Sequence, residues 1–144
     1  SKSPEIYLSK GEKTALEWVA KRTCEDAVIL AGAKTGMYIP AYTGRKVYYG
    51  HPYETVNAHR NEEIVERFFR GLSTYEDLQY LDKTDYIYIG PREREIGMLK
   101  DLKRVAIVYK NEEVTIYLWE IEYLTKDLET QIAASLYDFN NISQ

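Results

Sequence analysis

The chain has 144 residues, of which 44% are hydrophobic and 29% are charged, proportions typical of a globular protein rather than a disordered one. Its formal net charge of −4 argues against binding to a nucleic-acid backbone, because such binding requires a surplus of Lys and Arg. The single cysteine, Cys24, excludes an internal disulfide and a cysteine-based metal cage. The length predicts one domain with its own hydrophobic core.

The first element is predicted to be a helix that begins after Ser9. Ser9 and Glu12 have the spacing of a capping box, in which each side chain accepts a hydrogen bond from the other residue's backbone N–H. Apolar residues then recur at helical spacing as far as Arg22, which predicts one buried face. The short apolar run at residues 27–31 follows, and it predicts a buried central strand.

Residues 32–60 differ in composition from the rest of the chain. They hold four of the eight glycines and are rich in proline and tyrosine. Residues 47–49 are predicted to form a strand and the remainder a loop. Because long loops in compact domains usually have a function, we expect this stretch to contribute to a binding site. The chain has 14 tyrosines in all, which fit either strand propensity or a surface that stacks on a carbohydrate.

The remaining elements follow from local signals. Ser73 and Glu76 repeat the capping-box spacing, and Pro91 suits the first residue of a helix. The predicted helices cover residues 61–71, 73–81 and 91–99, and the predicted strands cover residues 85–89, 104–109 and 114–119. The last two strands flank a short polar connection, which predicts an antiparallel hairpin.

Strands that alternate with helices and then form a hairpin predict a three-layer α/β fold, with a mostly parallel sheet and an antiparallel C-terminal hairpin at one edge. Residues 1–124 are predicted to form this domain, and residues 125–144 a C-terminal helix or tail. In such sheets ligands bind beyond the carboxyl ends of the strands. Since residues 32–43 and 90–94 each follow a predicted strand, we expect them to share one rim.

Motifs for catalysis or cofactor binding are incomplete. His51 and His59 do not have metal-ligand spacing, so neither a metal nor a cofactor is predicted. His51 with Glu54 fits an acid/base pair, or else a histidine that orders the loop through a backbone hydrogen bond. Arg92 and Arg94 fit either an anion site or a solvated helix turn with ion pairs.

Three segments of the sequence form a recognisable set: TGMYIPAYTGR (35–45), VYYGH (47–51) with Glu54 and Thr55, and DYIYIGPRER (85–94). Taken together, they resemble the C-terminal soluble segment of bacterial multi-pass membrane proteins of the glycosyltransferase C (GT-C) type. The resemblance spans roughly residues 5–120. It implies ligand contacts at Arg45, His51, Glu54, Thr55, Arg92 and Arg94, with Tyr38 and Tyr42 as stacking rings.

The resemblance further implies a non-catalytic accessory or substrate-handling domain on the extracytoplasmic face, attached to the membrane through the transmembrane part of its own parent chain. That parent would use a lipid-phosphate sugar, and the segment itself would bind a carbohydrate or anionic ligand. Two alternatives stay open: an independent small-molecule-binding or protein-interaction domain, and a free-standing enzyme that uses His51 and Glu54. A complete chain, with no apolar run of about 20 residues and no signal peptide, would instead be cytoplasmic.

Overall fold

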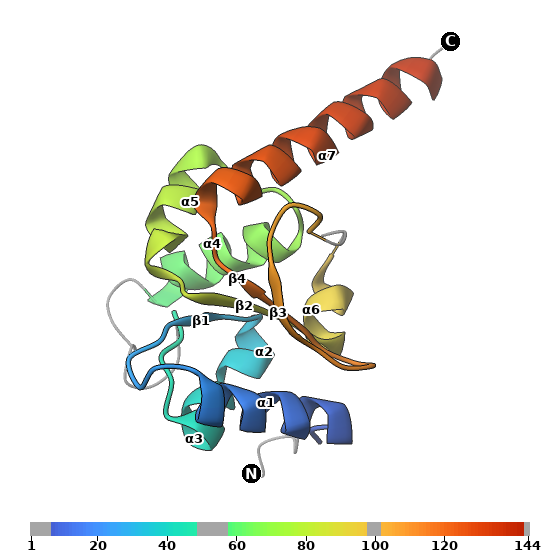
Figure 1. Ribbon diagram of the computed structural model, residues 1–144. Coiled ribbons are helices and arrows are strands. Elements are labelled where there is room, and N and C mark those ends of the chain that lie inside the picture. Colours follow the sequence, from blue (N-terminus) through green and yellow to red (C-terminus); the bar gives the residue numbers. More distant parts are fainter. Residues whose placement is uncertain (1–6, 49–57, 98–101, 143–144) are drawn as a thin grey trace, which may run out of the picture.

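The computed structural model describes residues 7–48, 58–97 and 102–142, which form a mixed α/β fold around a four-stranded sheet (Figure 1). The strands are β1 (Ile29–Leu30), β2 (Tyr86–Ile89), β3 (Ile107–Lys110) and β4 (Thr115–Leu118). The helices are α1 (Lys10–Arg22), α2 (Ala33–Gly36), α3 (Ile39–Thr43), α4 (Ala58–Phe69), α5 (Tyr75–Tyr80), the 3-10 helix η1 (Leu81–Lys83), α6 (Pro91–Ile96) and α7 (Ile121–Ile142).

The sheet has the strand order β1-β2-β4-β3 and is mixed. β1 pairs with β2 in parallel, whereas β4 pairs antiparallel with both β2 and β3. The expected C-terminal hairpin is present with β3 at the edge, but a mostly parallel sheet is not found among these strands. The reason is that β4 lies directly beside β2 along four residue pairs, so the hairpin supplies half of the sheet.

Within the described residues, the strand expected at residues 47–49 is not found. Lys46 makes one isolated parallel bridge with Val28, and no strand is assigned to Val47 or Tyr48. The Tyr48 hydroxyl instead donates to the carbonyl oxygen of Leu81 at 2.9 Å, and it lies 2.6 Å from the Thr84 hydroxyl. β1 therefore has only this single bridge on its outer side, within the part of the chain that the structure describes.

Helices cover both faces of the sheet. Side chains alternate between the faces along each strand, so neighbouring residues of one strand pack into two different buried clusters. On β2, Ile87 belongs to a buried cluster that includes Phe68 of α4 and Leu124 of α7. Its neighbour Tyr88 belongs to a second cluster, which includes Leu16 of α1 and Ile39 of α3. Figure 1 shows α4, α5 and α7 on one side of the strands, with α1 and α3 on the other.

Capping interactions fix the starts of two helices. Ser9 and Glu12 form the expected capping box at α1. At α5 the box is made by Thr74 and Asp77, one residue later than the sequence predicted. Asp77 also accepts two hydrogen bonds from Arg67 of α4, both of 2.8 Å, so a contact between two helices selects the capping pair.

The stretch predicted to be a long loop contains α2 and α3. Pro40 lies in the first turn of α3, and Gly44 ends that helix with a φ of 71°, a left-handed conformation that favours glycine. Residues 49–57 lie outside the described part of the chain. Of the residues described, no helix is both long enough and apolar enough to cross a membrane.

Candidate binding pocket

The expected shared rim is present at the carboxyl ends of β1 and β2. Because these two strands are parallel, the segments that follow them, beginning at Gly32 and Gly90, leave the sheet at the same edge. The buried side chain of Glu93 joins the two segments. One carboxylate oxygen accepts hydrogen bonds from the Gly32 N–H at 3.0 Å and the Thr35 hydroxyl at 2.6 Å. The other accepts from the Gly90 N–H at 2.9 Å.

The environment of Glu93 opposes its ionisation. Burial raises the pKa of the Glu93 carboxyl above its ordinary value, while the hydrogen bonds from Thr35, Gly90 and Gly32 act in the opposite direction. The packing around it is also tight, since a Cβ atom at Gly32 would lie 2.8 Å from Ile96 Cδ1 and 2.9 Å from Glu93 Oε2. Glycine at position 32 therefore allows α2 and α6 to approach each other.

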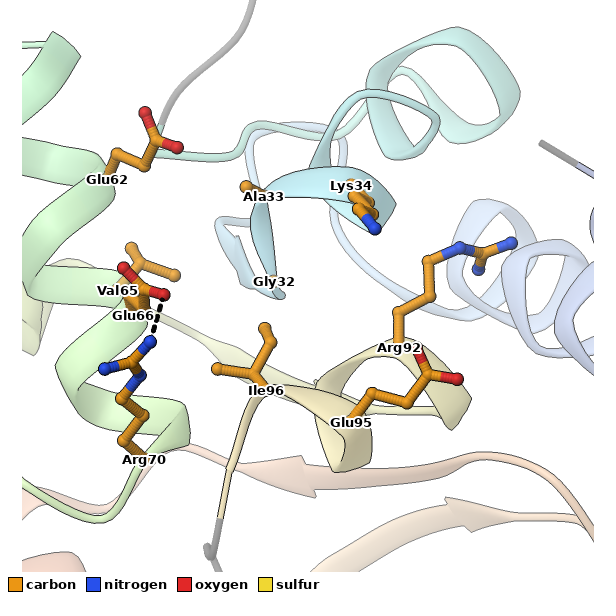
Figure 2. Close-up of a pocket in the computed structure, with 10 residues that line it drawn as sticks. All are labelled: Gly32, Ala33, Lys34, Glu62, Val65, Glu66, Arg70, Arg92, Glu95 and Ile96. Atoms are coloured by element: carbon orange, nitrogen blue, oxygen red, sulfur yellow. Dashed lines mark hydrogen bonds and ion pairs between the residues drawn. The ribbon is translucent and has the colours of Figure 1, made fainter. Parts of the chain in front are cut away.

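A cavity of about 390 Å³ opens beside this junction (Figure 2). Three elements line it: the start of α2, one face of α4 and α6. The lining residues are Gly32, Ala33, Lys34, Glu62, Val65, Glu66, Arg70, Arg92, Glu95 and Ile96. Among the described residues, the lining thus has an apolar part, three cationic groups and three carboxylates.

The charged groups of the lining differ in how many partners they have. Arg70 pairs with Glu66 at 2.8 Å within α4. Arg92 pairs with Glu12 of α1 and donates to the Tyr7 carbonyl oxygen at 3.2 Å, and Figure 2 shows its guanidinium directed away from Ile96. By contrast, three charged side chains form no hydrogen bond or ion pair with another described residue. They are Lys34, Glu62 and Glu95.

Of the predicted site residues that the structure describes, Arg92 alone lines this cavity. Tyr38 is not among the lining residues, but its ring centre lies 6.0 Å from Cζ of Arg92, which is one of them. Tyr42 is exposed and is not part of the lining. Arg94 points toward the β3–β4 hairpin, where it donates to the Glu113 carbonyl oxygen at 2.5 Å. The remaining predicted contacts apart from Arg45 lie outside the described residues: His51, Glu54 and Thr55.

Arg45 is buried at the carboxyl end of α1 rather than in the cavity. Its Nε donates to the Thr23 hydroxyl at 2.9 Å and its Nη1 to the Thr43 carbonyl oxygen at 3.0 Å. Nη2 donates to the carbonyl oxygens of Ala20 and Thr23, both at 2.9 Å. These bonds satisfy carbonyl groups that the end of a helix leaves without partners. Arg45 therefore acts in the fold, and its guanidinium is occupied.

The sequence did not single out Lys34, Glu62 or Glu95 as site residues. Lys34 lies in the stretch that follows the first strand, and position in that stretch was the signal that could have identified it. Glu62 falls near the start of the helix predicted at residues 61–71, where a carboxylate is favourable without any ligand, so its place in the cavity lining has no separate signal in the sequence. Only the packing of three separate elements brings these residues to one cavity.

Within the described residues, His, Cys, Asp and Glu side chains form no cluster of three that could hold a metal ion. No protein-family model matches the chain, and no curated protein is similar to it in sequence. The residues and geometry of the pocket therefore carry the functional argument, and the resemblance to GT-C-type proteins stays a prediction.

Proposed function

We propose that this chain is a ligand-binding domain without a catalytic centre of its own, and that its pocket takes a small, hydroxyl-rich molecule that carries one anionic group. The observation that supports this proposal is the set of unpartnered charges around the cavity. Lys34 provides one ammonium group, while Glu62 and Glu95 provide carboxylates without described partners.

The chemistry of these groups defines the ligand class. An ammonium group with three N–H donors binds an anionic oxygen, and an ionised carboxylate accepts hydrogen bonds from hydroxyl groups. The cavity volume of about 390 Å³ is at the small end of the range for small-molecule sites. No aromatic ring is among the lining residues that the structure describes, so we expect recognition by hydrogen bonds rather than by ring stacking.

A sugar phosphate combines these properties, and it also fits the resemblance to GT-C-type proteins. On this proposal the chain is a substrate-handling accessory domain, carried on the extracytoplasmic side by the membrane-embedded part of a longer protein. The helices on both faces of the sheet support describing the domain as three layers. An independent small-molecule-binding domain would use the same pocket, and the sequence of the parent protein would distinguish the two.

The direct test is binding of a hexose 1-phosphate, measured by calorimetry and by the shift in thermal unfolding. A ligand that binds only the folded state raises the unfolding temperature in proportion to the logarithm of its concentration. We expect a clear shift with the hexose phosphate and a smaller one with the neutral hexose or with inorganic phosphate. Lys34→Met should weaken binding at least tenfold, about 1.4 kcal/mol, because it removes the cation.

Lys13→Met is the matched control, since Lys13 is an exposed lysine of α1 that does not line the cavity. It removes the same charge from the chain but should leave binding unchanged. Equal losses in both variants would show an effect of net charge only. An absence of binding by the unmodified chain, or full binding by Lys34→Met, would contradict the proposal.

A further inference from the structure

The C-terminal half of α7 carries an apolar stripe that the rest of the described chain does not cover. Leu124 and Leu128, near the start of α7, are buried in the core cluster that packs against the sheet. Beyond them the helix continues to Ile142, and Figure 1 shows it projecting away from the other labelled elements. The stripe consists of Ile132, Leu136, Phe139 and Ile142, of which Ile132 is the least exposed, at 51%.

The stripe continues the buried face of the same helix. With 3.6 residues per turn, Ile132 and Leu136 follow Leu128 along one side, and Phe139 and Ile142 lie close to the same line. Such a surface is unfavourable in water. The exposed segment is also about 14 residues long, near the length at which isolated helices are only marginally stable. It contains Thr, Ser, Asn and Asp, which are poor helix formers.

The charge of this segment restricts its partner. From Asp127 to the end of the sequence there is no Lys or Arg, whereas helices that lie on membrane surfaces are rich in these residues. Two of its acidic residues already have partners: Asp127 pairs with Arg104 at 2.9 Å, and Glu129 accepts from the Tyr75 hydroxyl at 2.7 Å. Beyond Glu129 the described helix has one charged residue, Asp138. A strongly charged partner would therefore gain little here.

We propose that a second copy of this chain covers the stripe, through antiparallel pairing of the two α7 helices. The body of each chain sits at the N-terminal end of its α7, so antiparallel pairing places the two bodies at opposite ends and keeps them apart. The overlap of about 14 residues is roughly 21 Å long. Centred beside Leu136, it sets Ile132 of each copy near Phe139 of the other, and no two acidic residues face each other.

The expected interface is small but sufficient for association. Complete burial of one such side chain removes on the order of 100 Å² from water, so four from each copy remove about 800 Å², and the small neighbours raise the total toward 1,000 Å². Ala133 and Ser135 beside the stripe allow the helices to approach closely. An interface of this size falls among weak, transient associations, so we expect a dimer that dissociates on dilution rather than a permanent one.

Sedimentation equilibrium of the unmodified chain tests this proposal. At about 100 µM we expect a mass twice the 16.8 kDa of one chain, with dissociation on dilution. The helical circular-dichroism signal per residue should increase with concentration, because pairing stabilises the end of α7. Leu136→Glu should weaken self-association at least tenfold, since it places a charge in the centre of the interface on both copies.

Ala134→Glu is the matched control, because residue 134 lies on the opposite side of the same helix and receives the same charge. It should associate as the unmodified chain does. A monomer at every concentration, or equal effects of the two substitutions, would overturn the proposal. So would binding of the monomer to vesicles of neutral phosphatidylcholine that Leu136→Glu abolishes, because a lipid surface would then be the partner.

Discussion

Charged residues around the rim of the sheet fall into two groups that look alike in the sequence. In one group, each side chain is buried and its bonds are satisfied: Glu93 accepts three hydrogen bonds, and Arg45 donates four. In the other, Lys34, Glu62 and Glu95 face the cavity and have no described partner. Glu93 holds two walls of the pocket together, Arg45 ties the end of α1 to the end of α3, and the second group is available to a ligand.

This difference shows that the role of a charged residue follows from the number of its partners rather than from its charge or its place in a motif. A satisfied, buried group stabilises the fold, and its removal leaves other buried polar atoms without partners. An exposed group without partners contributes little to stability, so its replacement should affect binding alone. Substitutions in the two groups should therefore separate stability from binding.

The largest effect is expected from Glu93→Ala. This change leaves the N–H groups of Gly32 and Gly90 and the hydroxyl of Thr35 without their acceptor in a buried site. Each unsatisfied buried donor costs about 1–3 kcal/mol, and partial relaxation gives a net loss of about 3 kcal/mol. Urea unfolding measures this net loss in the free energy of unfolding. A loss similar to that of an exposed glutamate, for which Glu76→Ala serves as the control, would contradict the role of Glu93 as the link between α2 and α6.

Arg45→Ala should have the next largest effect. The carbonyl oxygens of Ala20, Thr23 and Thr43 lose their donors, although the part-buried end of α1 allows water to replace some of them. We expect a loss of about 2 kcal/mol in the free energy of unfolding. Affinity for the pocket ligand should remain unchanged, because Arg45 does not line the cavity.

Arg45→Lys sharpens this test, since it keeps the positive charge but cannot reproduce the planar set of donors. It should recover less than half of the lost stability. A normal free energy of unfolding in both variants, combined with weakened binding of the hexose phosphate, would move Arg45 to the ligand-binding group and reverse our assignment.

The parts of the fold that the sequence predicted correctly depend on local signals. The capping box of α1 and Pro91 at the start of α6 involve residues a few positions apart, and their geometry is fixed within one helical turn. The shared rim was also predictable, because it needs only that β1 and β2 are parallel neighbours. The helices α2 and α3 were missed since each has at most five residues, too few for a periodic pattern.

Long-range contacts explain the remaining differences. The position of β4 between β2 and β3 depends on strand pairing across the whole chain, which no local pattern specifies. The same holds for Arg45, whose partners on α1 lie more than 20 residues away in sequence. A motif identified Arg45 as a polar contact, and only the fold shows that its contacts are with the protein itself.

The smallest effects, and the last test of the comparison, concern pH. Two buried carboxyl groups should give opposite slopes. The hydrogen bonds from Arg67 lower the pKa of Asp77, so the stability it contributes is fully present above its unfolded pKa, near 3.8, and is lost as the pH falls through the lower, folded value. Burial raises the pKa of Glu93, so the folded state binds more protons than the unfolded state between about 4.5 and the folded pKa, and stability falls as the pH rises through that interval.

Urea unfolding at several pH values between about 3 and 7 would separate these contributions. Asp77→Asn keeps the acceptor for the Thr74 N–H but removes the charge that pairs with Arg67, so it should lose about 1 kcal/mol near pH 7, and the loss should shrink below pH 3.8. Glu93→Gln should show the reverse, with its largest loss relative to the unmodified chain near pH 4 and a smaller one near pH 7.

Parallel pH profiles for the two variants would mean that Glu93 is ionised throughout, held by its three donors against the effect of burial. The junction between α2 and α6 would then carry a buried negative charge beside the pocket, and the anionic group of a ligand would have to bind near Lys34, away from Glu93.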